Sequence, residues 1–455
     1  MAEYYIDIIY VFSAVSFILS LKWLSSVATA RRGVIAGILG MSLAVGGTLL
    51  SPSIEQYYLI AIAFVIGSSI GIPMALMPMT AVPQRTALSH AFGAMAAALV
   101  GTAEYYLRNT SIDTFTMSAL SIEVLLGSLT FTASLLAAGK LQEILPTRPI
   151  TFRFQNVFNL AFLGVAVLAG LYVVINPEAT YMFPVIIIAA LIFGVLLILP
   201  IGGADMPTVI SLLNSYAGLA AAMMGFVLNN KLLIIAGALD GSSGLILSIT
   251  MSKAMNRSFT NVLFGAFGQV QATADNAEQK TYRSASAEEA AELMRTASSI
   301  MIIPGYGMAV AHAQHKVREL FDVLTSQGVD VKFAIHPVAG RMPGHMNVLL
   351  AEADIPYDNL VEMDEANPEF PQTDIALVIG ANDVTNPAAR NDKSSPIYGM
   401  PILDVDKARL VMVNKRSMSP GFAGIDNELY YNDETLMLFG DSKSFIADIV
   451  NELSD

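Results

Sequence analysis

The sequence predicts a multi-pass α-helical membrane domain followed by a doubly wound, Rossmann-like α/β domain. The first observation is composition, because 54% of the 455 residues are hydrophobic and only 14% are charged, which is typical of a membrane protein. The second is charge distribution: residues 1–260 hold 11 Lys/Arg and 10 Asp/Glu, whereas residues 261–455 hold 14 and 28. The third is the alternation of strand and helix patterns after residue 298. One half is therefore expected in lipid and the other in water.

The membrane domain is expected to have about nine spans, since nine apolar segments can cross roughly 30 Å of hydrocarbon. These segments are Tyr4–Leu21, Val34–Leu50, Tyr57–Met77, Ala87–Tyr106, Thr116–Ala138, Asn156–Ile175, Tyr181–Ile201, Thr208–Leu228 and Leu232–Met255. The first segment contains Asp7 and has no basic stretch before it, so we interpret it as a retained span and not as a signal peptide.

The basic residues of the loops predict the orientation. An odd number of spans places the N-terminus and the acidic domain on opposite sides of the membrane. The loops on the side of the acidic domain contain Lys22, Arg31, Arg32, Arg85, Lys140, Arg148, Arg153, Lys253 and Arg257. The loops on the other side contain Arg108 and Lys231. This asymmetry predicts that the acidic domain is cytoplasmic.

Five polar residues lie in or beside the spans and are candidates for a proton path, because ionisable groups are costly in lipid. They are His90, Glu123, Asp205, Asn214 and Asp240. Histidine has an ordinary pKa of about 6.5, so His90 suits a proton relay. For each residue the alternative is a hydrogen bond that only joins two helices.

The C-terminal half predicts a linker and then one domain. Residues 1–257 are expected to form the membrane domain, residues 258–286 a polar linker, and residues 287–455 the α/β domain, which begins with a short helix. The expected strands are Ile300–Ile303, Val331–Ile335, Asp374–Ile379, Leu410–Val413 and Leu436–Leu438, with a weaker one at Leu360–Met363. This alternation predicts a parallel sheet whose ligand binds at the carboxyl ends of the strands.

The first of these strands ends in a Gly-x-Gly turn. Gly305 permits a tight turn and Gly307 permits close approach of a pyrophosphate to the backbone. A continuous helical pattern follows, and its N-terminus is expected to favour phosphate. Val310 occupies the place of a third glycine, so an ordinary turn is the alternative for this motif taken alone.

The second strand indicates which dinucleotide is bound. An NAD site would place Asp or Glu at its end to bind the ribose 2′-hydroxyl. This strand instead continues into His336 and Pro337, with Arg341 soon after. A guanidinium without a competing carboxylate suits a 2′-phosphate, which favours NADP.

Two further motifs follow apolar strands. Lys415 and Arg416 are expected at the ligand side of the sheet, although a solvated pair is an equally good interpretation. Gly380-Ala-Asn-Asp383 could present Asn382 and Asp383 to ribose or amide groups, or could form a simple turn. The acidity of this half excludes nucleic acid as a partner, and the chain has no cysteine for disulfide or thiolate chemistry.

At these motifs the whole chain resembles the β subunit of the proton-translocating, Si-Re-specific NAD(P)+ transhydrogenase. The similar stretches are GYGMAVA from Gly305, VAGRMPGHMNVLLAE from Val338, VIGAND from Val378, KRSM from Lys415, SHAFG from Ser89, GADMP from Gly203 and LNSY from Leu213. The resemblance implies an NADP(H) domain on a proton-conducting helix bundle in a bacterial inner membrane.

The resemblance also implies a partner α subunit that binds NAD(H), a dimer of heteromers, and hydride transfer from NADH to NADP+ coupled to inward proton movement. It places the dinucleotide on Gly305, Tyr306, Gly307, Val310, Gly380, Asn382 and Gly421, and the 2′-phosphate on Arg341, Lys415 and Arg416. It places Asp383 beside the nicotinamide, and His90, Asn214 and Asp205 on the proton path.

Direct hydride transfer requires no protein acid or base, so no metal site is expected, and His312 and His315 are interpreted as solvated. Phe422 departs from the family pattern, in which a tyrosine follows the glycine. The rival hypothesis is a transporter or channel that a cytoplasmic NADP-sensing domain gates, since fold alone does not determine function.

Overall fold

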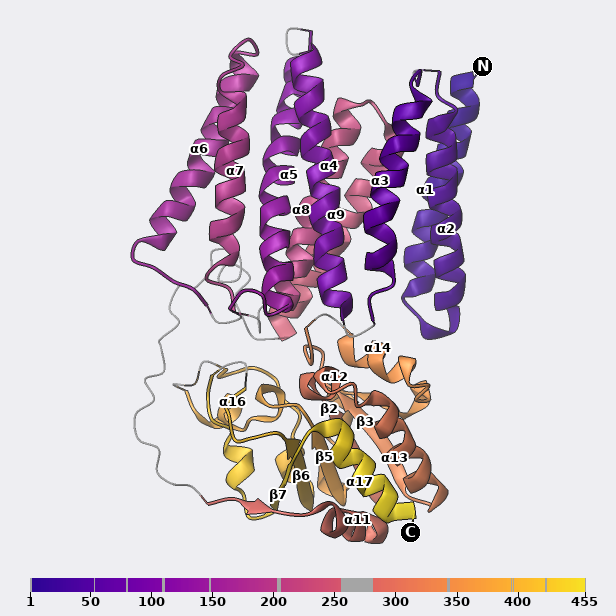
Figure 1. The fold of residues 1–455 in the computed structure, drawn as a ribbon, viewed down its shortest axis with the longest axis vertical. Coiled ribbons are helices and arrows are strands. Elements are labelled where there is room, and N and C mark those ends of the chain that lie inside the picture. Colours follow the sequence, from indigo (N-terminus) through magenta and orange to yellow (C-terminus); the bar gives the residue numbers. More distant parts are fainter. Residues whose placement is uncertain are drawn as a thin grey trace.

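The computed structural model describes residues 2–52, 54–78, 81–108, 111–146, 149–202, 206–254, 281–341, 344–393, 395, 397–421 and 424–454. Asp205, Arg148, Arg257, Phe422 and residues 258–280 of the expected linker lie outside this description. The described chain forms a helix bundle and, at one end of it, a smaller α/β domain (Figure 1).

The described part of the N-terminal half contains nine helices. They are α1 (Ala2–Leu24), α2 (Val27–Leu49), α3 (Tyr57–Ala75), α4 (Val82–Arg108), α5 (Thr114–Leu141), α6 (Gln155–Ile175), α7 (Phe183–Ile198), α8 (Met206–Val227) and α9 (Lys231–Ala254). Eight of them are long and apolar enough to cross a membrane, and α7 is a shorter apolar helix. Helix α7 has 16 residues, so it is about 24 Å long at 1.5 Å per residue.

Helix α5 is at the centre of the bundle and contacts α4, α6, α7 and α8, while α8 also contacts α4 and α9. Small residues allow these close approaches. A Cβ added at Gly218 of α8 would lie 2.3 Å from the backbone nitrogen of Gly241 in α9. Helices α1 and α2 form a hairpin that meets the rest of the bundle through α1 and α9.

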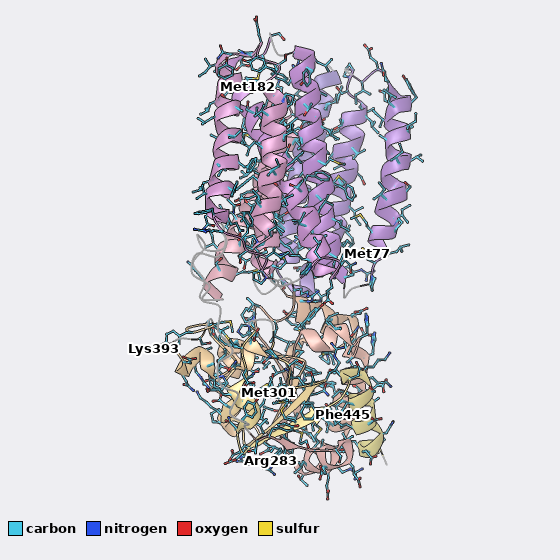
Figure 2. The ribbon with its side chains drawn as sticks, turned by 60° about the vertical axis from the view of Figure 1, so that its left-hand side comes forward. Met77, Met182, Arg283, Met301, Lys393 and Phe445 are labelled. Carbon is cyan, nitrogen blue, oxygen red and sulfur yellow. The ribbon has the colours of Figure 1, made fainter. Side chains whose placement is uncertain are left out.

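The two ends of the bundle differ. Lys231 forms an ion pair with Asp7 at 3.0 Å, so the start of α9 lies beside the start of the chain. Met182 lies at this end of the bundle, and Met77 lies at the other end, near the α/β domain (Figure 2). The chain thus begins at the end of the bundle that is far from the α/β domain and enters that domain from the other end. This agrees with an odd number of crossings before the α/β domain.

The α/β domain contains one parallel sheet with strand order β1-β7-β6-β5-β2-β3-β4. The strands are β1 (Arg283–Ser284), β2 (Ser299–Pro304), β3 (Asp330–Ile335), β4 (Leu360–Glu362), β5 (Ile375–Ile379), β6 (Leu410–Lys415) and β7 (Thr435–Phe439). The chain first adds β3 and β4 on one side of β2 and then β5, β6 and β7 on the other. This doubly wound order confirms the predicted fold class.

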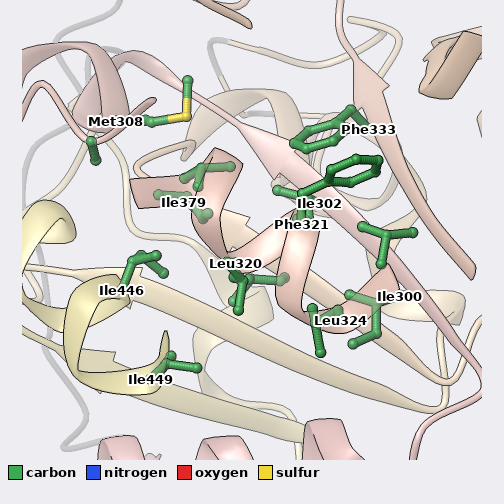
Figure 3. Packing of buried hydrophobic residues seen from close by; sticks show 14 of the residues in the cluster. Ile300, Ile302, Met308, Leu320, Phe321, Leu324, Phe333, Ile379, Ile446 and Ile449 are labelled. Atoms are coloured by element: carbon green, nitrogen blue, oxygen red, sulfur yellow. The ribbon is translucent and has the colours of Figure 1, made fainter. Parts of the chain in front are cut away.

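Two hydrophobic clusters cover the two faces of the sheet. On one face α11 (Ala287–Thr296), α13 (Gln314–Ser326) and α17 (Ser442–Ser454) pack on the strands through the cluster around Ile302, Leu320 and Ile446 (Figure 3). The other face is covered by short helices and loops that include Phe370 and Tyr430. A capping box begins α11, in which Ser286 and Glu289 bond each other's backbone N–H groups.

Strand β1 was not among the predicted strands. It pairs in parallel with β7, with Arg283 opposite Leu436, at the edge of the sheet. Two residues produce too short a pattern for a sequence-based strand prediction.

Candidate active site

The candidate site lies where the carboxyl ends of β2, β5 and β6 meet. Pro304 pairs with Ile379, and Ile379 pairs with Asn414, so the three strands end at the same level. Gly305, Gly380 and Lys415 follow or end these strands. Because the chain reverses its direction of strand addition between β2 and β5, this is the point of the sheet at which a ligand crevice forms.

Three glycines join the turns after β2 and β5. Gly305 N–H donates to Ile379 O and Gly307 N–H donates to Gly380 O, each at 2.9 Å. A Cβ at Gly305 would lie 2.4 Å from Ala381 Cα, and one at Gly307 would lie 2.6 Å from Gly380 Cα. Both predicted glycines are therefore necessary for backbone-to-backbone packing of two turns, in addition to any approach of a ligand.

The helix after the Gly-x-Gly turn is not continuous, so that prediction was wrong. Helix α12 (Tyr306–Val310) has five residues, and α13 starts only at Gln314. His312 between them has a φ of +50°, which ends a right-handed helix. One turn of helix carries little macrodipole, so phosphate binding at this place would depend on the N–H groups of the turn. Val310 is 42% exposed.

Arg341 lies between Tyr306 and the membrane domain. Its guanidinium carbon is 4.0 Å from the centroid of the Tyr306 ring. Its Nη1 donates to Leu141 O at 2.6 Å, and its Nη2 pairs with Glu143 Oε1 at 2.9 Å. The structure thus brings the predicted phosphate ligand beside the Gly-x-Gly turn, but its partners here belong to the end of α5 and the loop that follows it.

The end of β3 carries a buried histidine where an NAD site would carry a carboxylate. Val338 N–H donates to His336 Nδ1 at 3.2 Å, so the imidazole uses its Nε2–H to donate to Pro401 O at 2.8 Å. Burial lowers the pKa of His336 to about 4. His336 is therefore neutral near pH 7 and joins the loop after β3 to the loop before β6.

Asn382 and Asp383 follow β5 and lie under the loop that contains Gly421. Asn382 Oδ1 accepts hydrogen bonds from Tyr430 at 2.8 Å and from Asn427 Nδ2 at 3.0 Å. Its Nδ2 is buried without a hydrogen-bond partner among the described residues. A Cβ at Gly421 would lie 2.2 Å from this Nδ2 and 2.8 Å from Asp383 Oδ1, so only glycine fits there.

The two predicted cations after β6 differ in their surroundings. Lys415 is partly buried, its Nζ donates to Ser419 O at 2.5 Å, and it lies 4.9 Å from the centroid of the Tyr430 ring. Desolvation lowers the pKa of Lys415, while the carboxylates of Asp383 and Asp426 oppose this shift. Arg416 is exposed. Lys415 is thus part of the cluster around Asp383, and Arg416 points to solvent.

In the membrane domain Asn214 connects two of the predicted proton-path residues. Its side chain lies beside His90 of α4 and beside Asp240 of α9. Gly244 of α9 makes room for this amide, since a Cβ there would lie 3.0 Å from Asn214 Nδ2. The structure therefore brings together three polar side chains from three helices.

Glu123 lies apart from this group. Its side chain is fully buried in α5, and it faces Gly101 of α4, where a Cβ would lie 3.0 Å from Glu123 Oε1. Gly101 follows His90 by eleven residues on the same helix, which corresponds to about 16 Å along its axis. Glu123 is thus not a direct partner of His90.

Sequence reasoning did not find several residues that support the site. They are Gln84, Glu143, His345, Asn427 and Tyr430. His345 lies in the VAGRMPGHMNVLLAE stretch, but nothing in that stretch indicates its bond to the backbone of Arg341. The other four belong to no recognisable motif, because each acts through a contact that joins distant segments. The only local signal is Asp426-Asn427 before an apolar run, which is typical of a loop returning to the sheet.

The comparison with known proteins extends over nearly the whole chain. Residues 6–452 match the family model described as NAD(P) transhydrogenase beta subunit. The NAD(P) transhydrogenase subunit beta of Rhodospirillum rubrum is 50% identical over 456 residues, which cover 98% of this chain and 98% of that protein. The protein of the same name from a designated strain of that species shows the same identity and coverage. These matches do not favour a gated transporter or channel. The chain belongs to the NAD(P) transhydrogenase beta subunit family.

Proposed function

We propose that this chain is the NADP(H)-binding, proton-translocating subunit of an NAD(P)+ transhydrogenase. The observation that carries the proposal is the packing of Gly305, Gly307 and Gly380 at the ligand edge of the sheet, on the side of the domain nearest the bundle. Helices α12 and α14 (His345–Glu352) lie on this side, and α11 lies on the far side (Figure 1). The Gly-x-Gly turn therefore lies on the side of the α/β domain that faces the helices carrying His90, Asn214 and Asp240.

The residues at this edge fit a dinucleotide. The N–H groups of Gly305, Gly307 and Gly380 are already bonded within the turns and strands, so a pyrophosphate would be held by the other N–H groups of the two turns. The buried amide nitrogen of Asn382 has no partner among the described residues and is ready to donate to a ligand oxygen. Gly305, Tyr306, Gly307, Val310 and Gly380 would hold the dinucleotide, with Asn382 and Gly421 beside it.

The same edge supports NADP over NAD. His336 occupies the place where an NAD site carries a carboxylate. Both of its ring nitrogens are already bonded within the protein, so they are not available to a ribose 2′-hydroxyl. Lys415 and Arg416 end and follow β6 and would pair with a 2′-phosphate, together with Arg341 when its guanidinium is turned toward the ligand. Bound NADP+ supplies the carbon that accepts the hydride.

The protein's part in hydride transfer is positioning. Asn382 is held by Asn427 and Tyr430, so its amide keeps one orientation. Asp383 would lie at the nicotinamide end of the dinucleotide. Its carboxylate interacts electrostatically with Lys415, so a change at the nicotinamide would be felt by this lysine. Hydride transfer then needs two rings in contact and water excluded, with no acid or base.

The proton path is proposed to run through His90, Asn214 and Asp240, with Asp205 at its cytoplasmic end. The contact of Asn214 with both His90 and Asp240 supports this assignment. The imidazole of His90 would take up and release the proton, because histidine changes charge near physiological pH. Asn214 would keep the ring in one orientation.

We infer that the chain works with a separate α subunit, as the name of a β subunit implies, and that this partner binds NAD(H). The complex would be a dimer of such heteromers in a bacterial inner membrane, with the acidic domain in the cytoplasm. The excess of basic residues in the loops beside that domain supports this orientation. The domains would be residues 1–257 and 287–455 joined by 258–286.

Reconstitution tests the activity. Vesicles that contain this chain and its α subunit should reduce an NADP+ analogue with NADH and move protons inward. The chain without its partner should give no turnover, because its sequence holds one dinucleotide fingerprint. Full-rate transfer by the chain alone would refute the division of the two nucleotides between subunits.

Arg416→Ala tests the cofactor. A charge-assisted contact to phosphate contributes about 1.5–3 kcal/mol, so NADPH binding to the reconstituted complex should weaken about tenfold or more. The matched control is Arg409→Ala, which removes the same side chain at the opposite end of β6, where it pairs with Asp374 at 2.8 Å. Calorimetry that gave both variants the same NADPH affinity would remove Arg416 from the phosphate site.

A further inference from the structure

One side chain of the α/β domain reaches the membrane domain at the level of the loop after α5. Arg341 donates from Nη1 to Leu141 O and from Nη2 to Glu143 Oε1. Leu141 is the last residue of α5, so its carbonyl is at the negative end of the helix dipole. Two acceptors of the membrane domain thus bind one guanidinium in the fork arrangement that arginine prefers.

The two partners differ in burial. The side chain of Arg341 is 7% exposed, whereas that of Glu143 is 65% exposed. A buried cation without a partner is costly, so the position of Arg341 depends on these contacts. Glu143 itself fills no space in a core, and changing it should not disturb the fold.

Arg341 is also fixed on the side of its own domain. Its backbone N–H donates to His345 Nδ1 at 3.0 Å, and its guanidinium covers the Tyr306 ring. Burial and the charge of Arg341 lower the pKa of His345 to about 4, so the imidazole remains neutral and can accept this bond. The guanidinium is thus attached to the Gly-x-Gly turn through Tyr306.

On the membrane side, the carbonyl of Leu141 that accepts from Arg341 also accepts a hydrogen bond from helix α4. Leu141 O also accepts a hydrogen bond from Gln84 Nε2 at 3.2 Å. Gln84 is buried near the start of α4 and precedes His90 by six residues, or about 9 Å of helix. One carbonyl therefore joins Arg341 to the helix that carries the proposed proton relay.

We propose that Glu143 is a positioning residue for the coupled reaction, because it holds Arg341, and with it the Gly-x-Gly turn, against the ends of α4 and α5. This inference rests on the proposed function and adds a residue that links its two halves. Glu143 touches neither the nucleotide turn nor His90. Its action is through Arg341, which covers Tyr306 of the Gly-x-Gly turn and shares the Leu141 carbonyl with Gln84 of the helix that carries His90.

The test uses vesicles with both subunits and measures protons moved per hydride transferred. Glu143→Gln keeps the size of the side chain and removes the charge, so the ratio should fall at least twofold. The Kd for NADPH should not rise, because Glu143 is not a ligand and its loss leaves Arg341 able to turn toward the 2′-phosphate. The control is Glu55→Gln, an exposed carboxylate in the α2–α3 loop at the other end of the bundle, which should leave the ratio unchanged.

A second variant tests the partner of Glu143. Arg341→Lys keeps the charge but loses the two-pronged geometry, so it should lower the ratio as well. The double variant should be no worse than the more severe single one, since both changes break the same contact.

A proton-to-hydride ratio in Glu143→Gln equal to that of Glu55→Gln would overturn the inference. It would also be overturned if the double variant lowered the ratio by the product of the two single reductions. Failure of the proposed function would look different. In that case the unmodified chain with its partner would transfer no hydride, and no ratio would exist to compare.

Discussion

The hydroxyl of Tyr430 donates a 2.8 Å hydrogen bond to Asn382 Oδ1. Tyr430 is 1% exposed, and burial raises the pKa of its phenol, so the hydroxyl keeps the proton that it donates. Together with Asn427 it occupies the oxygen of the Asn382 amide. The nitrogen of that amide is left facing Gly421, and this fixes which atom a ligand would meet.

Tyr430→Phe should therefore weaken NADPH binding about three- to tenfold. One buried hydrogen bond contributes about 1 kcal/mol, and Asn427 still holds the amide in part. Calorimetry on the reconstituted complex measures this effect. The control is Tyr431→Phe, which removes the neighbouring hydroxyl that bonds Asp426 at 3.1 Å near the surface. Equal Kd values for the two variants would show that the Tyr430 hydroxyl does not orient Asn382.

Gly380→Ala should destabilise the α/β domain and reduce NADPH binding by more than tenfold. Gly380 has a φ of +65°, and a Cβ there would lie 2.4 Å from Gly307 Cα, so the substitution meets both backbone strain and a clash. Because the atoms that the added Cβ meets belong to the backbone, the clash can be relieved only if the turn after β2 and the turn after β5 move apart. Hydrogen exchange of the amides in β2 and β5 measures the opening of this region.

Gly328→Ala separates the two causes. Gly328 has a φ of +88°, but nothing lies within 4 Å of an added Cβ. It should show the cost of backbone strain alone, about 1 kcal/mol, with unchanged NADPH binding. If Gly380→Ala were no more severe than Gly328→Ala, the close packing of the two turns would not matter for the site.

The stability of the α/β domain should fall as the pH is lowered from about 6.5 to about 4. Burial holds the pKa of His336 at about 4, below the ordinary 6.5, so in this range the unfolded chain binds a proton that the native chain does not. Stability conferred by the neutral imidazole is complete above pH 6.5 and is lost as the pH falls through this window. The loss amounts to about 3 kcal/mol, at 1.36 kcal/mol for each pKa unit.

Hydrogen exchange of the β3 amides at several pH values measures this loss. In His336→Gln the amide can still accept from Val338 and donate to Pro401, but it does not titrate. The substitution should therefore reduce the dependence of stability on pH. The remaining slope should come from His345, whose pKa is also lowered to about 4. An unchanged slope in His336→Gln would mean that folding does not lower the pKa of His336.

Much of the fold could be predicted because its signals are local. Apolar length located the nine helices, and strand runs separated by helical patterns gave the doubly wound sheet. The Gly-x-Gly turn after the first strand also located Gly305 and Gly307 at the right edge of the sheet. The break at His312 was missed because Met308, Val317, Leu320 and other apolar residues keep a helical spacing across it.

The site was only partly predictable, because its remaining features depend on contacts between distant segments. The contact of Gly307 with Gly380 requires the pairing of β2 with β5. The pairing of Arg341 with Glu143 joins two domains across 198 positions of sequence. The contact of Asn214 with His90 depends on which spans are neighbours. No periodicity or motif in a single sequence contains this information.

If one chain couples a nucleotide site to a proton relay, the number of protons moved per hydride must depend on the imidazole of His90, which His90→Ala removes. The measurement uses vesicles that contain both subunits, with Ser89→Ala, a substitution of the exposed neighbour, as the control. His90→Ala should move no protons and depress overall transhydrogenation, whereas Ser89→Ala should keep the unmodified ratio. If His90 only packed between helices, the yield and stability of the protein would fall and the surviving protein would move the unmodified number of protons per hydride. That unmodified ratio in His90→Ala would contradict a proton relay through His90.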